Sequence, residues 1–324
     1  PVLIVLRFPV DRVDYDLWWH MALGKYYITH HTLTIDHSIF SWTPTDPTWI
    51  YNTCLGSIAI YLFYIFMGGF GLWFLQSLMF LGIFLFYFLF LRLLRQRLDL
   101  NSVTIIAAIG IACSMACRYY KPELFSAFLF GWLVFIFFHV KISRNKYIFY
   151  LYPFMFALWV NLHGAFVVGL IFLSMTFTGE ILNRVFFPGK SMTKEELIHF
   201  GIACILSLVA TLLNPYGIDY LVSTFIGVTS ELNAQMNNKF VLAYVSLWRY
   251  LMTGGPSFLS VGITAWIMTI FFLSIFFLSS YELFKKKTFD FSVLIISSAL
   301  YWKGMETSRT SYFFPIASFF ILFY

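Results

Sequence analysis

The stretch IYNTCLGSIAIYLFYIFM at residues 50–67, which the pair Gly68-Gly69 follows, decides the topology of this chain. A membrane core of about 30 Å needs about 20 apolar residues per helix, and this stretch falls near that limit. If residues 50–67 cross a membrane, the acidic segment 14–16 lies on the same side as the basic segment 92–97. If residues 50–67 lie along the membrane surface instead, these two segments lie on opposite sides.

The composition excludes a water-soluble domain with an ordinary polar surface. The 324 residues are 60% hydrophobic, 22% aromatic and only 11% charged, and the mean hydropathy is +0.80. The apolar runs are continuous rather than alternating, which favours helices over barrel strands. We therefore expect an all-α integral membrane protein of about ten transmembrane helices, which needs no nucleic-acid partner. The clear spans are 71–92, 101–117, 123–140, 147–161, 165–185, 197–213, 257–283, 289–302 and 311–324.

The distribution of charge favours a surface position for residues 50–67. With that choice, the inner connections hold twelve basic and six acidic residues, whereas the outer segments hold nine of each. Lys and Arg are typical of cytoplasmic loops. We expect a juxtamembrane helix that Gly68-Gly69 ends, in a protein of the cytoplasmic membrane whose active face is extracytoplasmic. The inverted topology, with 50–67 as a short span, stays open as the alternative.

This topology predicts a single domain in five parts. Residues 1–9 would end a first span, and residues 10–70 would form an outer loop with juxtamembrane helices. The helical bundle would cover 71–213, a second outer loop 214–256, and the last spans 257–324. Long ordered loops are more often functional than connecting, so we look for a site in the outer loops.

The outer loop contains Asp14-Tyr15-Asp16-Leu17-Trp18-Trp19-His20. On an extended chain both carboxylates point the same way, whereas on a helix they lie about 200° apart. A same-facing pair can hold a divalent cation such as Mg²⁺ or Mn²⁺, or supply a general base. Trp and Tyr at helical spacing from Trp18 to Tyr27 predict a helix in the headgroup layer, and a plain interfacial belt is the simpler interpretation of them.

Further polar residues occur at the outer ends of the expected spans. Arg118 and Lys121 stand against the positive-inside tendency, which indicates an anionic partner such as a lipid phosphate. A salt bridge from Arg118 to Asp14 or Asp16 is the alternative. His163 is either an acid, base or phosphate ligand or a hydrogen-bonded structural residue. The candidate site is completed by His20 and Arg309 as further phosphate-binding residues.

Several motifs in order resemble prokaryotic membrane proteins of the GT-C glycosyltransferase class. They are Asp14-x-Asp16-x-Trp18-Trp19-His20, Ile35-Asp36-His37-Ser38-Ile39-Phe40-Ser41-Trp42, Arg118-x-x-Lys121-Pro122, Trp159-x-Asn161-Leu162-His163-Gly164 and Leu213-Asn214-Pro215-Tyr216-Gly217. The resemblance implies transfer of a sugar from a polyprenyl-phosphate donor to a glycan, lipid or protein acceptor on the outer face. It also implies an interfacial helix in the first outer loop. Asp14 and Asp16 take the position of the acidic base or metal ligand in that class.

Two functions of other classes stay open. A non-catalytic subunit would keep the fold and pack within a larger membrane complex. A transporter or flippase for a lipid-linked glycan would need charges buried between facing helices. The expected spans carry almost none, and Glu180 is the chief exception.

Overall fold

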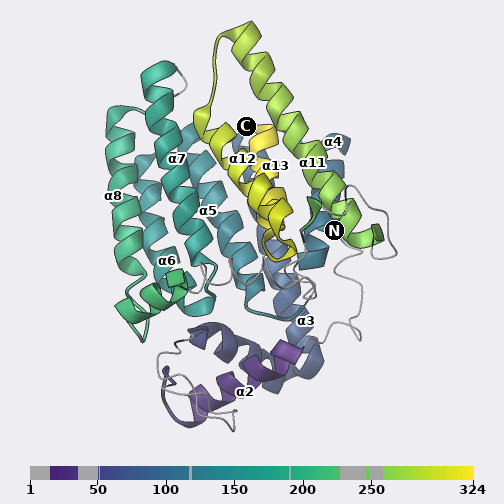
Figure 1. The fold of residues 1–324 in the computed structure, drawn as a ribbon, viewed down its shortest axis with the longest axis vertical. Coiled ribbons are helices and arrows are strands. Elements are labelled where there is room, and N and C mark those ends of the chain that lie inside the picture. Colours follow the sequence, from purple (N-terminus) through teal and green to yellow (C-terminus); the bar gives the residue numbers. More distant parts are fainter. Residues whose placement is uncertain are drawn as a thin grey trace.

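A computed structural model describes residues 15–35, 50, 52–116, 119–189, 191–226, 246–248, 251 and 258–324 of the chain. Within these residues the regular structure is helical, as the sequence predicts (Figure 1). The helices form a bundle of roughly antiparallel elements, and α2 (Tyr15–Thr29) lies across one end of it. Asp14, Arg118 and the segment 36–49 lie outside the described residues.

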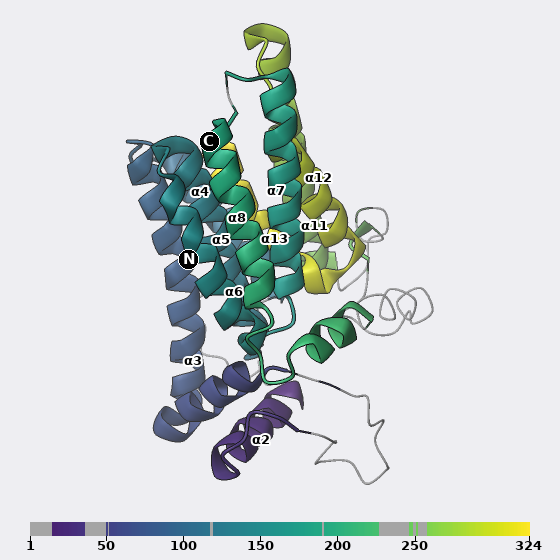
Figure 2. The same ribbon diagram turned by 90° about the vertical axis from the view of Figure 1, so that its left-hand side faces the viewer.

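The helix α3 (Cys54–Leu93) is two helices that meet at the Gly-Gly pair. Gly68 has φ 61° and ψ −147°, which is outside the helical region. A residue with a Cβ atom avoids this conformation, whereas glycine adopts it at little cost. Figure 2 shows the second half of α3 running along the bundle and the first half crossing beneath the bundle beside α2. The predicted break after residue 67 is therefore present.

The first half of α3 packs closely on α2. A Cβ atom on Gly24 would lie 2.3 Å from the Ser57 carbonyl oxygen, so only glycine allows this approach. The buried face of α2 carries Leu17, His20, Met21 and Tyr27. Trp18, by contrast, is 52% exposed. The Trp and Tyr residues from Trp18 to Tyr27, which predicted a helix in the headgroup layer, therefore lie only partly on the face of α2 that packs on α3.

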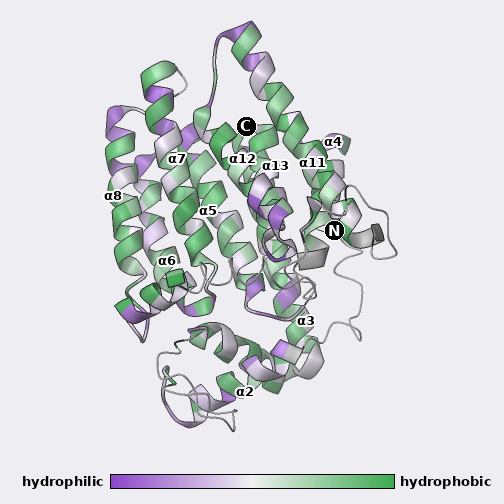
Figure 3. Ribbon diagram, viewed as in Figure 1, coloured by the Kyte–Doolittle hydropathy of each residue, from purple (hydrophilic) through white to green (hydrophobic). Residues whose placement is uncertain are grey.

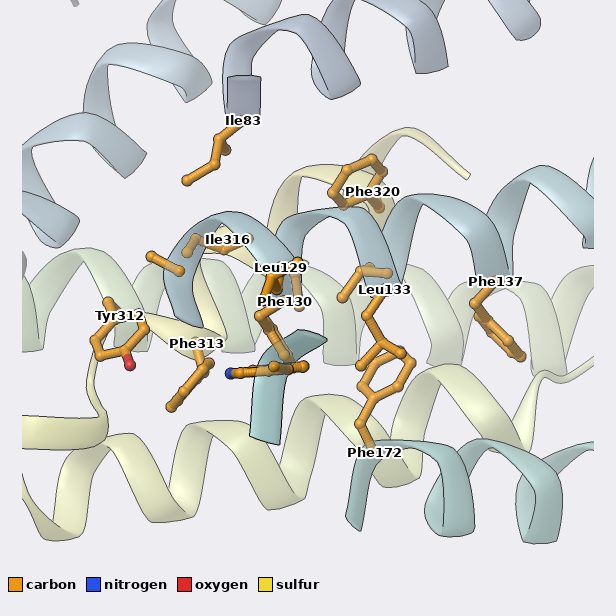
Figure 4. Packing of buried hydrophobic residues seen from close by; sticks show 14 of the residues in the cluster. Ile83, Leu129, Phe130, Leu133, Phe137, Phe172, Tyr312, Phe313, Ile316 and Phe320 are labelled. Atoms are coloured by element: carbon orange, nitrogen blue, oxygen red, sulfur yellow. The ribbon is translucent and has the colours of Figure 1, made fainter. Parts of the chain in front are cut away.

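The bundle is centred on α5 (Glu123–Ser143), whose side chains are largely buried. Figure 4 shows Phe130 of α5 between Phe172 of α7 (Phe166–Phe186) and Phe313 of α13 (Phe313–Phe323). The Phe130 ring lies 4.8 Å from that of Phe313 and 5.6 Å from that of Phe172, both edge to face. Each such ring pair stabilises the fold by about 0.5–1.5 kcal/mol beyond the contribution of the apolar area that it buries. The core is therefore aromatic and depends on α5.

The chain is an all-α membrane protein, but only some of the expected spans form helices long enough to cross a membrane. Four helices in the described residues are long and apolar enough to cross a membrane: Cys54–Leu93, Glu123–Ser143, Phe166–Phe186 and Val261–Lys286. In Figure 3, where the ribbon is coloured by residue hydropathy, the helices of the bundle are mostly hydrophobic. The shorter helices are α4 (Leu100–Ala116), α6 (Leu151–Leu162), α8 (Lys194–Ala210), α12 (Phe291–Glu306) and α13.

Two of the shorter helices explain why hydropathy predicts about ten spans. At 1.5 Å per residue, the 12 residues of α6 cover only about 18 Å. A 3₁₀ turn, η1 (Lys146–Tyr150), precedes α6 and lengthens its apolar run without lengthening the α-helix. Every residue of α13 from Phe313 to Ile321 is buried, so its apolar sequence reflects a place in the core.

The connections between helices gather at two opposite ends of the bundle. Ser126 at the start of α5 meets His163 after α6, whereas Arg144 after α5 meets Glu196 at the start of α8. We call the end that holds α2 the α2 end and the opposite one the far end (Figure 1). The far end includes the short π-helix η3 (Glu282–Lys286) and the start of α12.

Candidate functional site at the α2 end

His20 is held in the contact between α2 and α3. Its side chain is 4% exposed, and its Nδ1 atom lies 3.0 Å from Ser57 Oγ. Burial lowers the pKa of His20 to about 4, and nearby His163 and Lys121 lower it while Glu123 and Asp16 oppose the change. The imidazole is therefore neutral at pH 7. It lies within electrostatic reach of four other polar residues of the α2 end.

Asp16 and Lys121 form an ion pair. Lys121 Nζ donates to Asp16 Oδ2 at 2.6 Å, and the two side chains are 18% and 60% exposed, respectively. The sequence predicts roles for both residues in a site, and the structure brings them together from segments 105 residues apart. The predicted alternative, a salt bridge from Arg118 to Asp14 or Asp16, stays a prediction because Arg118 and Asp14 lie outside the described residues.

His163 caps the end of α6 and belongs to a chain of hydrogen bonds. Trp159 Nε1 donates to Ser126 Oγ at 2.8 Å, and Ser126 Oγ lies 2.8 Å from His163 Nδ1. A serine oxygen donates one hydrogen and accepts up to two, so Ser126 can bond to Nδ1 in either tautomer of the imidazole. The other ring nitrogen, Nε2, faces Glu123 Oε1 at 4.0 Å.

Arg309 and Glu123 lie near His163 at the α2 end, because the charges of both residues act on its imidazole. Burial lowers the pKa of His163 to about 4; Glu123 opposes this, whereas the charges of Arg309 and Lys121 contribute to it. Arg309 lies on the turn η4 (Ser308–Thr310), just before α13. Both imidazoles of the site are thus neutral hydrogen-bonding groups near two cations.

Asn161 joins the motif Trp159–Gly164 to the motif Leu213–Gly217 and to the stretch 50–67. Asn52 Nδ2 donates to Asn161 Oδ1 at 3.2 Å, and Asn161 Nδ2 donates to the Leu213 carbonyl at 2.7 Å. Asn214 orders the next turn by accepting from Tyr216 N–H at 2.9 Å. The side-chain amides of Asn52, Asn161 and Asn214 form hydrogen bonds with backbone groups, so their role in this structure is to hold the loops of the α2 end in place.

An open cavity of about 340 Å³ lies beside these amides. Its lining consists of Leu33, Cys54, Leu55, Asn161, Leu213, Asn214 and Pro215. The charged and imidazole residues of the site are not part of this lining. The described residues therefore place the cavity next to the motifs but not on the ion pair.

Three residues of the site could not be assigned from sequence. Ser126 and Trp159 lie in apolar runs, where they resemble ordinary core residues. Glu123 is visible as an outer charge, and its spacing of three residues from Ser126 puts both on one face of α5. That spacing could have indicated that Glu123 and Ser126 belong to one site. The hydrogen bond between Ser126 and His163 joins residues 37 positions apart, so no local sequence pattern predicts it.

The predicted metal site is only partly described. Asp16 lies in the first turn of α2, and Asp14 lies outside the described residues. No group of three or more His, Cys, Asp or Glu side chains that could hold a metal ion occurs in the described part of the chain. The structure thus adds no ligand to the predicted pair of aspartates.

A second polar cluster occupies the far end. Lys141 is one of the twelve basic residues that the sequence assigns to the inner connections, but its side chain is 1% exposed and lies inside the bundle. Lys141 Nζ lies 2.6 Å from Glu180 Oε1 and 2.5 Å from Asp290 Oδ2. The three charges come from α5, α7 and the start of α12, which is why no local pattern reveals the cluster.

The class that these observations define is an all-α membrane protein with polar clusters at both ends of an apolar bundle. Comparisons of the chain with protein families, with characterised proteins and with solved structures found no significant match. The likeness to GT-C glycosyltransferases accordingly rests on the sequence motifs.

Proposed function

We propose that this protein is a membrane glycosyltransferase that moves a sugar from a polyprenyl-phosphate donor to an acceptor on the extracytoplasmic face. One observation carries the proposal. Four separate segments gather at one end of an apolar bundle and bring together Asp16, His20, Lys121, Glu123, His163 and Arg309. A lipid-linked phosphate sugar needs both a polar end and an adjoining apolar surface. The acceptor is a glycan, a lipid or a protein.

The cations and the imidazoles suit the phosphate of such a donor. Lys121 and Arg309 supply positive charge, and His20 and His163 supply neutral hydrogen-bonding groups because both have a pKa of about 4. Lys121 leaves Asp16 for the phosphate when the donor binds, and this releases the carboxylate. The exposed position of the Asp16 carboxylate keeps the cost of that exchange small, since surface ion pairs contribute about 0–1 kcal/mol.

The released carboxylate serves as the general base. The hydroxyl oxygen of the acceptor bonds to the anomeric carbon of the donor while the bond from that carbon to the phosphate oxygen breaks. The lipid phosphate leaves with the bonding electrons, and Asp16, together with Asp14, takes the hydroxyl proton. Asp14 and Asp16 are also the residues that would hold a divalent cation such as Mg²⁺ or Mn²⁺, and no step of the proposal depends on it.

The second candidate is a non-catalytic subunit of a larger membrane complex. It is favoured by the ion pair between Asp16 and Lys121, which occupies two of the proposed functional groups. It is also favoured by the cavity, whose lining contains uncharged residues. In that case the α2 end would be a surface for another membrane protein.

Replacing Asp16 by Asn distinguishes the two candidates. We expect sugar transfer in proteoliposomes, assayed with a panel of polyprenyl-phosphate hexoses and pentoses, to fall by about 10²-fold or more because the general base is lost. Asp219→Asn is the matched control, because Asp219 is an exposed carboxylate that follows the Leu213–Gly217 motif. Full transfer by the Asp16→Asn variant would refute the proposed mechanism.

A further inference from the structure

The outer surface of the second half of α3 is a single apolar stripe. Along residues 71–93 the exposed side chains are those of Phe74, Leu78, Leu81, Leu85, Phe88 and Arg92. Their spacing of three or four residues puts them on one face of the helix. The apolar members are between 41% and 55% exposed, and Figure 2 shows this half of α3 along one edge of the bundle. On a helix that crosses a membrane, such a face lies against the lipid chains.

The stripe ends in arginine at the far end of the bundle. The ring centre of Phe90 lies 6.0 Å from that of Phe138 in the second half of α5, so Arg92 lies close to the far end. Arg95 and Arg97 follow in the connection to α4, and both side chains are exposed. Three guanidinium groups therefore gather where the apolar stripe stops.

The turn after α3 is fixed by backbone hydrogen bonds. Gln96 N–H donates to the Leu91 carbonyl at 2.9 Å, and Arg95 N–H donates to the Arg92 carbonyl at 3.0 Å. Arg95 has φ 57°, the left-handed conformation that commonly ends a helix. Because the backbone groups of this turn bond to one another, the side chains of Arg92 and Arg95 are not needed to cap α3.

Acidic partners for the arginines are lacking in the described part of the chain. The ion pairs of these residues involve neither Arg92 nor Arg95 nor Arg97. The nearest acid in the sequence is Asp99, which accepts from Ser102 N–H at 2.8 Å and from Ser102 Oγ at 2.6 Å and so caps the start of α4. The cations that follow α5, by contrast, pair with glutamates at the start of α8. The positive charge at the end of α3 thus lacks compensation within the described residues.

The same connection also exposes apolar side chains. Leu98 is 52% exposed and Leu100 is 80% exposed. Exposed leucines beside arginines are typical of a segment at the membrane surface, where apolar groups enter the lipid chains and cationic groups meet the phosphates. Residues 92–100 therefore match both the charged and the apolar part of a phospholipid.

We propose that the far end of α3 is a binding site for an anionic phospholipid of the bilayer. Arg92 and Arg95 hold the phosphate, which planar guanidinium groups contact through paired hydrogen bonds. Leu98 and Leu100 enter the boundary between the head groups and the chains. One acyl chain of the lipid runs along the apolar stripe of α3.

The length of the stripe suits one lipid chain. A leaflet provides about 15 Å of hydrocarbon, half of a core of about 30 Å. At about 1.5 Å per residue, the helix from Arg92 to Leu81 covers about 16 Å, so the chain reaches Phe88, Leu85 and Leu81. This site and α2 lie at opposite ends of the bundle, so the lipid site is independent of the proposed sugar donor.

Native mass spectrometry of the protein released from vesicles of equal parts phosphatidylglycerol and phosphatidylcholine tests the proposal. We expect the wild type to retain phosphatidylglycerol preferentially, and the double variant Arg92→Gln, Arg95→Gln to lose this preference by about tenfold or more. Lys285→Gln with Lys287→Gln is the matched control, since it removes two exposed cations from the same end and leaves the stripe intact. An unchanged preference in the arginine variant, or an equal loss in the lysine variant, would overturn the proposal.

Photocrosslinking to the wild type locates the lipid without any variant. A phosphatidylglycerol with a photoreactive group next to its phosphate should label residues 92–100, and one with the group in its acyl chain should label residues 81–88. Excess unlabelled phosphatidylglycerol should abolish both reactions, whereas glycerol phosphate, which lacks the chains, should abolish neither. Labelling confined to other segments, or full competition by glycerol phosphate, would contradict the site.

Discussion

At the scale of the residue, the candidate site depends on imidazoles that are kept neutral. His20 is fixed by Ser57 and His163 by Ser126, which Trp159 orients in turn. A neutral imidazole both donates and accepts, whereas a protonated one only donates. In the proposed function, His20 and His163 therefore contact the phosphate without adding two further positive charges.

The pH dependence of stability follows from the pKa values of these two residues. Burial lowers the pKa of His20 and of His163 from 6.5 to about 4. The unfolded chain thus binds more protons than the folded protein between these values. Stability is fully present above about pH 6.5 and is lost as the pH falls towards 4, by about 3 kcal/mol or less per histidine.

Denaturant titrations in lipid between pH 7 and pH 4 measure this effect. We expect His20→Asn, which retains a hydrogen-bonding group near Ser57, to be less sensitive to acid than the wild type. His30→Asn is the control because His30 is exposed. Equal acid sensitivity of His20→Asn and the wild type would show that His20 does not contribute.

At the scale of the element, the break in α3 positions the site, because the first half of α3 carries Ser57 and with it His20. We expect Gly68→Ala to destabilise the protein by about 1–3 kcal/mol, since a residue with a Cβ must adopt φ 61° and ψ −147° there, a combination that is essentially restricted to glycine. Gly69→Ala is a close control: neither glycine has an atom within 4 Å of an added Cβ, and only Gly68 has a positive φ. Similar free energies of unfolding for the two variants would contradict the account.

The elements also show what sequence could and could not predict. The break at Gly68-Gly69 was predictable because it depends on a local preference of glycine. The burial of α13 was not, because hydropathy cannot separate a helix in the core from a helix in lipid. The partners of Lys141 lie 39 and 149 residues away, and only the folded bundle brings them together.

At the scale of the whole molecule, successive helices run in opposite directions, and this separates the polar residues of their connections into two groups. The α2 end holds Asp16, Lys121 and His163, and the far end holds the basic residues that follow α5. Lys146 pairs with Glu195, and Arg144 with Glu196, so part of the basic charge at the far end is neutralised. The remaining charge, with Lys285, Lys286 and Lys287, favours a cytoplasmic far end.

Labelling of single cysteines in intact cells measures the orientation. In a background without the native cysteines, we expect Thr29→Cys in α2 to react with a membrane-impermeant maleimide from outside. Ser143→Cys at the far end should react only after the membrane is permeabilised. Both residues are exposed, so access to the reagent decides the result. The reverse pattern would establish the inverted topology.

The central claim is that the α2 end binds a lipid-linked phosphate. The most direct measurement is a density map of the protein in lipid nanodiscs, recorded with and without added polyprenyl phosphate. We expect density for a head group in contact with Lys121 and Arg309, a lipid tail along the apolar helices, and Lys121 displaced from Asp16. Maps in which Lys121 stays on Asp16 and no head-group density appears at the α2 end would contradict the claim and favour the non-catalytic subunit.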